Sequence, residues 1–264
     1  MSVADQIVYL MYHELELPGR ALCDPDPGYV RYVVSVSDFK SQMSWLKDQG
    51  WKGQSVTQAL SGATSPAVVI TFDDGAQTDL ITAAPVLQDA GFGASFYITT
   101  GFLGKPGYLT HSQVRELADQ GFDIGCHSAT HPYLSDLPKE RLRSEILDPK
   151  LQLEQIIGRA VENFSCPGGR WNTRVAEITR ESGYRSMATS QTRANSAKTD
   201  PFCLGRVAIM RGTPLPVFQR LCSGRGLWKL QIAELARSSA KSLLGNGGYD
   251  RLRALLLHRA ESRQ

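Results

Sequence analysis

Residues 67–75 read AVVITFDDG, an apolar and mostly β-branched run that ends in two adjacent aspartates and a glycine. An apolar run of this length is typical of a strand that is buried on both faces of a parallel sheet. In parallel α/β folds the functional side chains follow the carboxyl ends of the strands. The stretch therefore predicts a central parallel strand whose end presents Asp73 and Asp74 to a site.

The rest of the chain alternates between strand-like and helix-like patterns around this run. The other predicted strands cover residues 7–13, 94–99, 122–127, 163–167 and 206–210. The predicted helices cover residues 37–50, a segment that ends at Gly91, 112–121, 139–157 and 173–183. Ser37 or Asp38 is expected to cap the helix that begins this series. Strands and helices that alternate at this interval predict an α/β fold of βα units around a parallel sheet or barrel.

The length of 264 residues favours one large domain, with or without an appendage. Residues 14–34 contain three prolines and two glycines with little periodicity, so we expect a long ordered loop near the cleft. The barrel is expected over residues 1–226. Residues 227–264 carry seven Lys/Arg and three Asp/Glu, a net charge of +4, and predict a basic helical extension with a break at 245–248. We expect its helices to pack on the barrel; contact with an anionic membrane surface or a partner-protein groove is the alternative.

The composition is that of a globular chain able to bury a substantial core, with 42% hydrophobic and 21% charged residues. The net charge of +3 argues against nucleic acid as the main partner, because phosphate binding needs a concentrated basic excess. No secretory signal pattern is found, and no stretch approaches the roughly 20 apolar residues of a membrane span. Five cysteines without a CxxC pair fit reduced thiols. We therefore expect a cytoplasmic protein.

Two histidines follow the predicted strand 122–127 in the sequence HSATH. If this segment forms a helical turn, His127 and His131 lie on one face, at a spacing that supplies two ligands to one metal ion. Together with one aspartate of the Asp-Asp pair they would form an open catalytic site with positions left for water and substrate. A structural Asp-Asp-Gly turn and an ordinary loop histidine pair are the alternatives.

A third polar segment, NFSCPGGRWN at residues 163–172, follows another predicted strand. Its proline and two glycines bring backbone N–H groups close to the strand-end cleft, where they are suited to bind an oxyanion. Trp171 offers an apolar or sugar-stacking wall. The alternative is an ordinary turn before a helix.

The segments TFDDG, HSATH and FSCPGG, in this order, resemble the polysaccharide deacetylase family, also called carbohydrate esterase family 4, over roughly residues 5–215. The resemblance implies a distorted (β/α) barrel that hydrolyses the N-acetyl group of amino sugars with a divalent metal. It implies three metal ligands: Asp74, His127 and His131. It also implies that Asp73 is the general base that activates the metal-bound water, and that the backbone N–H of Gly168 helps to hold the oxyanion.

The sequence departs from the family pattern at two positions of the third segment. Many members have an arginine three residues before the motif proline, where this chain has Phe164. Three arginines could pair with Asp73 instead: Arg170, Arg206 and Arg211. Together with Trp171, two of these, Arg170 and Arg206, are also predicted to bind substrate. The family's aromatic residue after the proline is Gly168 here, which predicts a roomier or differently lined cleft.

The general acid is the third departure, because the family's late Leu-x-His motif has no convincing copy. The segment LLLHR (255–259) contains His258, but it lies in the basic tail beyond the expected end of the barrel. His13 is the better candidate because it ends the predicted first strand and therefore faces the same side as the Asp pair. Tyr12-His13 also resembles the N-terminal strand-end histidine of a subgroup that deacetylates poly-N-acetylglucosamine.

These observations predict a metal-dependent N-deacetylase, a hydrolase of non-peptide carbon–nitrogen bonds, that acts on an N-acetylated amino sugar in a glycan or lipid-linked saccharide. Carbohydrate metabolism and exopolysaccharide biosynthesis are the expected context. The alternatives are another amide or O-acetyl ester as substrate, or a glycan-binding relative without turnover. Zinc is the preferred metal, and cobalt, nickel, iron and manganese are the alternatives, because a site of two histidines and one carboxylate accepts them all.

Overall fold

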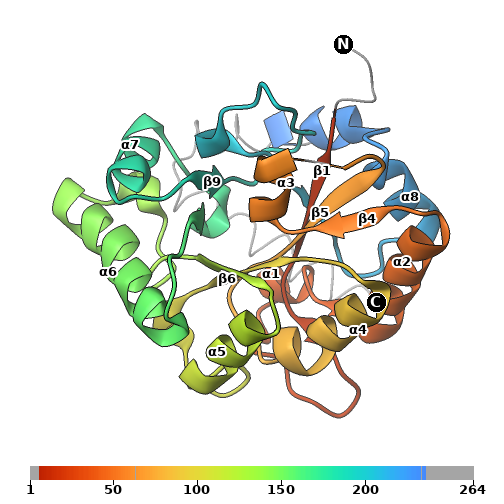
Figure 1. Ribbon diagram of the computed structural model, residues 1–264, viewed down its shortest axis with the longest axis horizontal. Coiled ribbons are helices and arrows are strands. Elements are labelled where there is room, and N and C mark those ends of the chain that lie inside the picture. Colours follow the sequence, from red (N-terminus) through yellow and green to blue (C-terminus); the bar gives the residue numbers. More distant parts are fainter. Residues whose placement is uncertain (1–5, 63, 233, 236–264) are drawn as a thin grey trace.

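The computed structural model describes residues 6–62, 64–232 and 234–235. The main sheet has eight strands in the order β10-β1-β5-β6-β7-β8-β9, with β4 beside the first half of β5, and every described strand pair is parallel. The strands are β1 (Val8–Tyr12), β4 (Lys52–Gln54), β5 (Ala67–Phe72), β6 (Ser95–Ile98), β7 (Asp123–Cys126), β8 (Asn163–Ser165), β9 (Ser186–Ala188) and β10 (Val207–Ala208). The sheet curls into a half-barrel with helices around it (Figure 1). The predicted α/β fold, a distorted (β/α) barrel, is confirmed.

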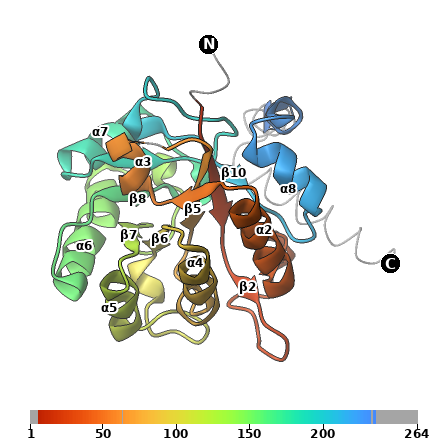
Figure 2. The same cartoon turned by 45° about the vertical axis from the view of Figure 1, so that its right-hand side comes forward.

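Most of the helices cover the convex side of the sheet (Figure 2), whereas the helix of residues 56–62 places Val56 in a cluster with Val69 and Tyr97 on the concave side. The helices are α2 (Val36–Asp48), α3 (Val56–Gly62), α4 (Ala84–Ala90), α5 (His111–Asp119), α6 (Lys139–Ile157), α7 (Thr173–Glu181) and α8 (Leu215–Cys222). Helix α2 contacts α4 and α8, and α6 contacts α5 and α7. This arrangement leaves the carboxyl ends of the strands as the edge on which loops converge.

The register of the strands aligns the ends that matter for the site. Tyr12 at the end of β1 pairs with Phe72 at the end of β5. Ile98 at the end of β6 pairs with Cys126 at the end of β7, and Cys126 pairs with Phe164 of β8. The residues that directly follow β1, β5 and β7 therefore emerge at the same edge of the sheet.

Aromatic side chains on adjacent strands bind the sheet to α2. The ring of Phe72 lies 5.2 Å from that of Tyr12 and 5.1 Å from that of Phe96, between ring centroids, and Phe39 of α2 meets Tyr12 edge-on at 5.2 Å. All four rings are fully buried. Burial of each ring contributes roughly 1.5–3 kcal/mol to the stability of the fold. These rings therefore hold together the strands whose ends carry the site.

Helix ends agree with the sequence signals in most places. Helix α6 spans the predicted residues 139–157 and ends at Gly158, whose φ of 70° lies in the left-handed region that terminates helices. The start of α2 differs from the prediction. The side chain of Ser35 accepts a hydrogen bond from the backbone N–H of Asp38, so Ser35 is the cap and not Ser37 or Asp38.

The 14–34 segment is more structured than the loop predicted for it. It contains β2 (Leu15–Glu16), the short helix α1 (Pro27–Val30) and β3 (Val34–Ser35), and β2 pairs with β3 in a two-stranded parallel sheet. The buried Glu14 carboxylate accepts hydrogen bonds from the backbone N–H of Cys23 and the hydroxyl of Tyr29. These long-range contacts order the segment, and they leave no trace in the local sequence pattern.

Four further strands and helices were not predicted: β4, α3, β9 and α8. Strand β4 has the sequence KGQ, which lacks the apolar pattern of a strand. It pairs with β5. A Cβ atom on residue 53 would lie 2.6 Å from Cγ of Phe92, so glycine at this position leaves room for the Phe92 side chain. Such an element depends on tertiary packing and not on local propensity.

The described chain ends in a helical segment at residues 227–235, with residue 233 outside the description. Gln231 Nε2 donates to the carbonyl of Thr192, and Glu234 accepts from the backbone N–H of Thr192, so this segment contacts the barrel. The rest of the predicted extension, which is residues 236–264 with the break at 245–248 and with His258, lies outside the described residues. Among the described residues, no helix has the length and apolarity required to cross a bilayer.

Candidate metal and catalytic site

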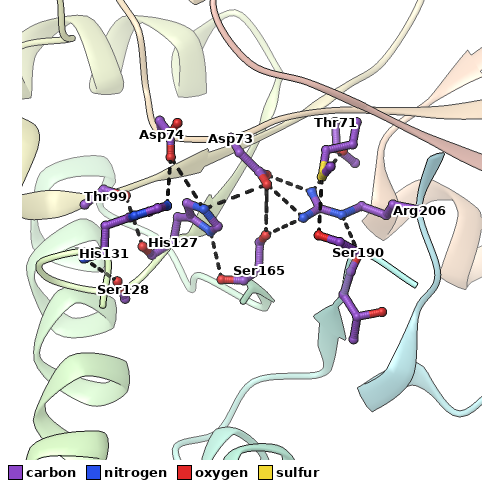
Figure 3. A network of polar contacts seen from close by, with 12 residues as sticks. Thr71, Asp73, Asp74, Thr99, His127, Ser128, His131, Ser165, Ser190 and Arg206 are labelled. Carbon is purple, nitrogen blue, oxygen red and sulfur yellow. Dashed lines mark hydrogen bonds and ion pairs between the residues drawn. The ribbon is translucent and has the colours of Figure 1, made fainter. Parts of the chain in front are cut away.

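The two aspartates that follow β5 point in different directions (Figure 3). Asp73 donates its backbone N–H to the carbonyl of Tyr12, which continues the pairing of β1 and β5. Asp74 then has a φ of 78° and Gly75 a φ of 83°, so the chain turns sharply. As a result, the carboxylate of Asp73 lies against Arg206 while that of Asp74 lies against two histidines.

Asp74, His127 and His131 form a cluster of metal-ligating atoms. The Oδ1 atom of Asp74 lies 3.5 Å from Nε2 of His127 and 3.4 Å from Nε2 of His131, and one ligand atom from each residue lies within 4.8 Å of the others. Asp74 Oδ1 is buried and has no hydrogen-bond partner among the described residues. Since ligand bonds to a divalent transition metal are about 2.0–2.2 Å long, these three atoms fit around one ion.

His127 is held in the form that binds a metal. Its Nδ1 lies 2.8 Å from the backbone carbonyl of Ser165, which accepts only if Nδ1 carries the proton. Nε2 therefore has its lone pair directed toward Asp74 and His131. Burial lowers the pKa of His127 to about 4, so the ring is neutral at neutral pH.

The structure corrects the predicted geometry of the second histidine. Residues 127–131 do not form a helical turn. Instead, Ser128 and His131 have φ angles of 66° and 63°, and the hydroxyl of Ser128 accepts the backbone N–H of His131. This loop folds back on itself and brings the two imidazole centroids to 5.0 Å.

Asp73 forms a buried ion pair with Arg206. The guanidinium donates from Nη1 to Oδ1 at 2.7 Å and from Nη2 to Oδ2 at 2.8 Å, and it also donates to the hydroxyl of Ser165 at 2.8 Å. Arg206 is 1% exposed, so it cannot reach a bound sugar. The prediction that Arg206 binds substrate is therefore wrong, and among the three arginines considered it is Arg206 that pairs with Asp73. Arg211 instead pairs with Glu16 at the surface.

The environment of Asp73 favours its ionised form. Burial alone would raise the pKa of this carboxyl group, but the positive charge of Arg206 and the hydrogen bonds that it donates hold the pKa well below its usual value. Asp73 is thus a carboxylate at neutral pH. It lies beside the metal-ligating cluster, with Oδ2 3.8 Å from Nε2 of His127.

His13 directly follows β1 at the same edge of the sheet. Its ring packs 4.9 Å from that of Tyr32, between centroids, and its buried Nδ1 has no hydrogen-bond partner among the described residues. Burial lowers the pKa of His13, while Asp74 and Asp73 oppose this shift by favouring the cation. His13 is thus electrostatically coupled to both aspartates.

The segment after β8 contacts Tyr133, which lies two residues after His131 in the sequence. Gly168 has a φ of 59°, and a Cβ atom on it would lie 2.9 Å from Cε1 of Tyr133. The guanidinium of Arg170 stacks 3.6 Å from the centroid of the same tyrosine ring, and Trp171 packs partly against the core. Tyr133 occupies the space into which a side chain at position 168 would project. An aromatic ring thus lies beside Gly168, although residue 168 itself has no side chain.

Sequence reasoning missed three residues that shape this site: Tyr133, Ser165 and Glu145. Ser165 is the last residue of β8, and its hydroxyl lies between Arg206 and Asp73. Its place as a polar residue at the end of a predicted strand is a sequence feature that could have indicated a role in the site. Tyr133 lies two positions after His131, but only the structure shows that it meets Gly168.

A curled parallel half-barrel with an Asp/His/His cluster at its strand ends defines the class of this protein: a (β/α) barrel that presents metal-ligating side chains at one rim. Within this class, the chain belongs to the polysaccharide deacetylase family, whose family model matches residues 61–187.

Individual relatives agree with this assignment. The Bacillus subtilis protein YxkH is 28% identical over 209 residues, which are 77% of this chain and 71% of that protein. A peptidoglycan-N-acetylglucosamine deacetylase of Bacillus cereus is 30% identical over 124 residues, 47% of this chain and 56% of that protein. The Streptococcus pyogenes deacetylase PplD has a similar fold, with a TM-score of 0.73 and 23% identity over 83% of this chain and 99% of that one.

Proposed function

We propose that this protein is a metal-dependent hydrolase that removes the N-acetyl group from an N-acetylated amino sugar in a glycan or a lipid-linked saccharide. The observation that carries the proposal is the pair of adjacent aspartates with separate environments. Asp74 converges with His127 and His131, whereas Asp73 is kept ionised beside them by the buried Arg206. One group suited to bind a cation thus lies next to one suited to accept a proton.

A divalent ion held by Asp74, His127 and His131 would supply Lewis acidity, which lowers the pKa of a water molecule and polarises the acetamide carbonyl. Zinc is our preferred ion, because two imidazoles and one carboxylate with open positions form a common catalytic zinc donor set. Cobalt, nickel, iron and manganese suit the same donors.

In the proposed mechanism, Asp73 accepts the proton of the attacking water. Its bidentate contact with Arg206 fixes the plane of the carboxylate, so the group needs little reorganisation when it accepts a proton. General base catalysis of this kind contributes about 10²–10⁴-fold to the rate. The backbone N–H of Gly168, placed after β8 by the left-handed turn of that residue, is proposed to donate to the oxyanion.

The amine must leave as a protonated group, because an amide anion is a poor leaving group. We assign this proton transfer to His13: burial lowers the pKa of its ring, and the neighbouring Asp74 and Asp73 offset part of that shift. Trp171 and Arg170, next to Gly168, are proposed to contact the sugar. Residues 1–226 form the proposed catalytic barrel, and residues 227–264 the proposed extension.

The names of relatives support an amino sugar substrate. One relative is a chitooligosaccharide deacetylase of Azorhizobium caulinodans, 30% identical over 47% of this chain and 58% of that protein. Another is the peptidoglycan-N-acetylglucosamine deacetylase described above. A cytoplasmic role in exopolysaccharide biosynthesis is part of the proposal, and five unpaired cysteine thiols support a reducing compartment.

The test combines metal analysis with acetate release from N-acetylglucosamine oligomers and lipid-linked N-acetyl sugars. We expect about one divalent ion per chain and acetate release by the wild type. Asp73→Asn should retain the metal and lose at least about 100-fold in kcat, since it removes the base but not a ligand. His127→Ala should lose the metal.

Three results would contradict the proposal in different ways. Metal binding without acetate release from any sugar would favour the glycan-binding alternative, and release from other amides or O-acetyl esters would favour the alternative substrate class. A wild-type protein that binds no divalent ion would rule out the metal site itself.

A further inference from the structure

The loop between the two histidines has a backbone that is costly to maintain. Ser128 and His131 both have left-handed φ angles, of 66° and 63°. Residues with a side chain pay roughly 1–2 kcal/mol for this conformation, so the surrounding contacts must hold it. The position of the His131 ring depends on these contacts, because the loop carries it back toward His127.

One buried carboxylate supplies several of these contacts. Oε2 of Glu145, on α6, accepts the backbone N–H groups of Thr130 at 2.8 Å and Ala129 at 3.1 Å, and Oε1 accepts the hydroxyl of Thr130 at 2.7 Å. Glu145 is only 3% exposed. A carboxylate is retained at such a position only when hydrogen bonds replace its lost hydration, and these three donors come from the histidine loop.

The opposite side of the loop is fixed by the 3-10 helix Thr100–Phe102. The backbone N–H of Gly101 donates to the carbonyl of Ala129 at 2.7 Å, and that of Thr100 donates to the carbonyl of Ser128 at 3.3 Å. A Cβ atom on Gly101 would lie 2.5 Å from the carbonyl oxygen of Ala129. The loop is thus held between this helix on one side and Glu145 on the other.

We infer that Glu145 is a positioning residue for the metal site, which sets His131 relative to Asp74 and His127 through the backbone of residues 129–130. The inference rests on the proposed metal-binding function of those three residues. His127 has its own anchor in the carbonyl of Ser165, so the effect falls mainly on His131. Groups that orient metal ligands in this way typically contribute 10–100-fold to metal affinity.

The expected effects of substitution follow from the donor and acceptor count. In Glu145→Gln the amide keeps one acceptor oxygen, and its NH₂ group faces donors of the loop. Metal affinity should therefore fall about 10–100-fold. Thr130→Val removes one donor and leaves both backbone contacts, so the loss should be smaller, whereas Thr130→Ser keeps the hydroxyl and should bind metal like the wild type.

The experiment uses the full chain with Zn²⁺ and Co²⁺ as probes. Zinc affinity is measured by competition with a chromophoric chelator, and the visible spectrum of the Co²⁺ form reports coordination geometry. Glu140→Gln is the matched control, because Glu140 lies exposed on the first turn of the same helix. The melting temperature of each metal-free variant is measured in parallel.

A weaker zinc affinity and an altered Co²⁺ spectrum in Glu145→Gln, with Glu140→Gln unchanged, would support the inference. Unchanged affinity and spectrum, with only a lower melting temperature, would show a purely structural role and overturn it. If Glu145→Gln does not fold, equal zinc affinities of Thr130→Val and Thr130→Ser would overturn it instead. Failure of the wild type to bind either ion would reject the proposed function together with this inference.

Discussion

At the scale of single residues, the site depends on a buried ion pair that joins distant parts of the chain. Phe164 occupies the position from which many family members supply an arginine, and Arg206 supplies the guanidinium from the loop before β10. Removing two charges from water is costly, and the bidentate geometry with further donation to Ser165 offsets that cost. The pair thus keeps the buried carboxyl group of Asp73 ionised.

The substitution Arg206→Met should leave the Asp73 carboxylate buried and unpaired. We expect a loss of about 3–5 kcal/mol in the free energy of unfolding at pH 7. The pKa of Asp73 is lowered in the native state, so the pair contributes stability above the unfolded value of about 3.9, and this contribution is lost as the pH falls toward the native value. The difference in unfolding free energy between wild type and variant should therefore be smaller at about pH 3 than at pH 7.

Urea unfolding of the metal-free proteins at both pH values measures this difference. The double variant Asp73→Asn/Arg206→Met is the control, because it removes both charges and should be more stable than Arg206→Met alone. Equal stability of the single and double variants would contradict the ion-pair argument.

Asp79 is a second buried acid near the site, and it is not compensated in the same way. It is fully buried in the π-helix Asp79–Ala83, and neither carboxylate oxygen has a hydrogen-bond partner among the described residues. Burial, together with Asp74, Glu14 and Asp73, raises the pKa of Asp79 well above its usual value. The residue therefore destabilises the folded state at neutral pH.

Asp79→Asn should stabilise the metal-free protein at pH 8 by at least about 1 kcal/mol. Because the native pKa is raised, the unfavourable contribution of Asp79 is absent below the unfolded value of about 3.9 and grows as the pH rises toward the native value. The stabilisation should consequently be smaller at pH 5. Melting temperatures of wild type and variant at the two pH values test this, and a gain that is independent of pH would reject buried charge as its cause.

At the scale of elements, the sequence predicted those parts whose signal is local. Strand β5 covers the continuous apolar run 67–72, and α6 covers the long helix-like segment 139–157. Since parallel strands end at a common edge, the convergence of Asp74 with His127 could also be inferred. The fold of the histidine loop could not, because its left-handed turns depend on hydrogen bonds to Glu145, a residue of another element.

Contacts between residues far apart in the sequence were the second feature that the sequence could not predict. Arg206 lies 133 residues from Asp73, and three arginines were compatible with the pairing. Only the paths of β9 and β10 decide among them, and both strands are too short to show a reliable pattern. The same holds for the contact of Tyr133 with Gly168, which requires the ends of β7 and β8 to be neighbours.

The wall formed by Tyr133 and Arg170 gives a prediction for substrate binding. Tyr133 is 36% exposed beside Gly168, the proposed oxyanion donor. Tyr133→Ala should raise KM for N-acetylglucosamine oligomers about tenfold, which corresponds to about 1.4 kcal/mol of lost aromatic contact. Zinc affinity should stay unchanged, because the ring is not a ligand.

Steady-state kinetics of acetate release and the chelator competition described above provide the two measurements. Tyr133→Phe keeps the ring and serves as the control, with a KM close to that of the wild type. A normal KM in Tyr133→Ala, or an equal rise in both variants, would exclude the ring as a sugar contact.

At the scale of the whole molecule, the barrel separates two features. One is the rim that carries Asp73, Asp74 and His127, called here the reactive rim, and the other is the helical segment at the end of the described chain. Metal-ligating and catalytic candidates lie at the carboxyl ends of the strands, where the register aligns them. The segment 227–235 instead contacts Thr192 in the loop that follows β9. The side chains of Trp228 and Ile232, one helical turn apart, are 58% and 57% exposed. Adjacent apolar side chains exposed at the surface in this way are typical of a contact with another molecule or a membrane.

The basic charge of residues 227–264 makes an anionic lipid surface the occupant to test. The Nζ atom of Lys229 lies 5.5 Å from the ring centroid of the exposed Trp228, and Arg225 precedes that residue by three positions in the sequence. An amphipathic segment with basic neighbours binds anionic bilayers through apolar burial and charge together. We expect the full chain to sediment with vesicles that contain phosphatidylglycerol and to remain unbound with neutral phosphatidylcholine vesicles.

The double variant Trp228→Ser/Ile232→Ser should reduce the bound fraction. Acetate release from water-soluble oligomers should stay at the wild-type rate, because neither residue lies at the reactive rim. Equal sedimentation of wild type and variant would exclude this surface as the lipid contact, and no sedimentation of the wild type would exclude lipid as the partner of the segment.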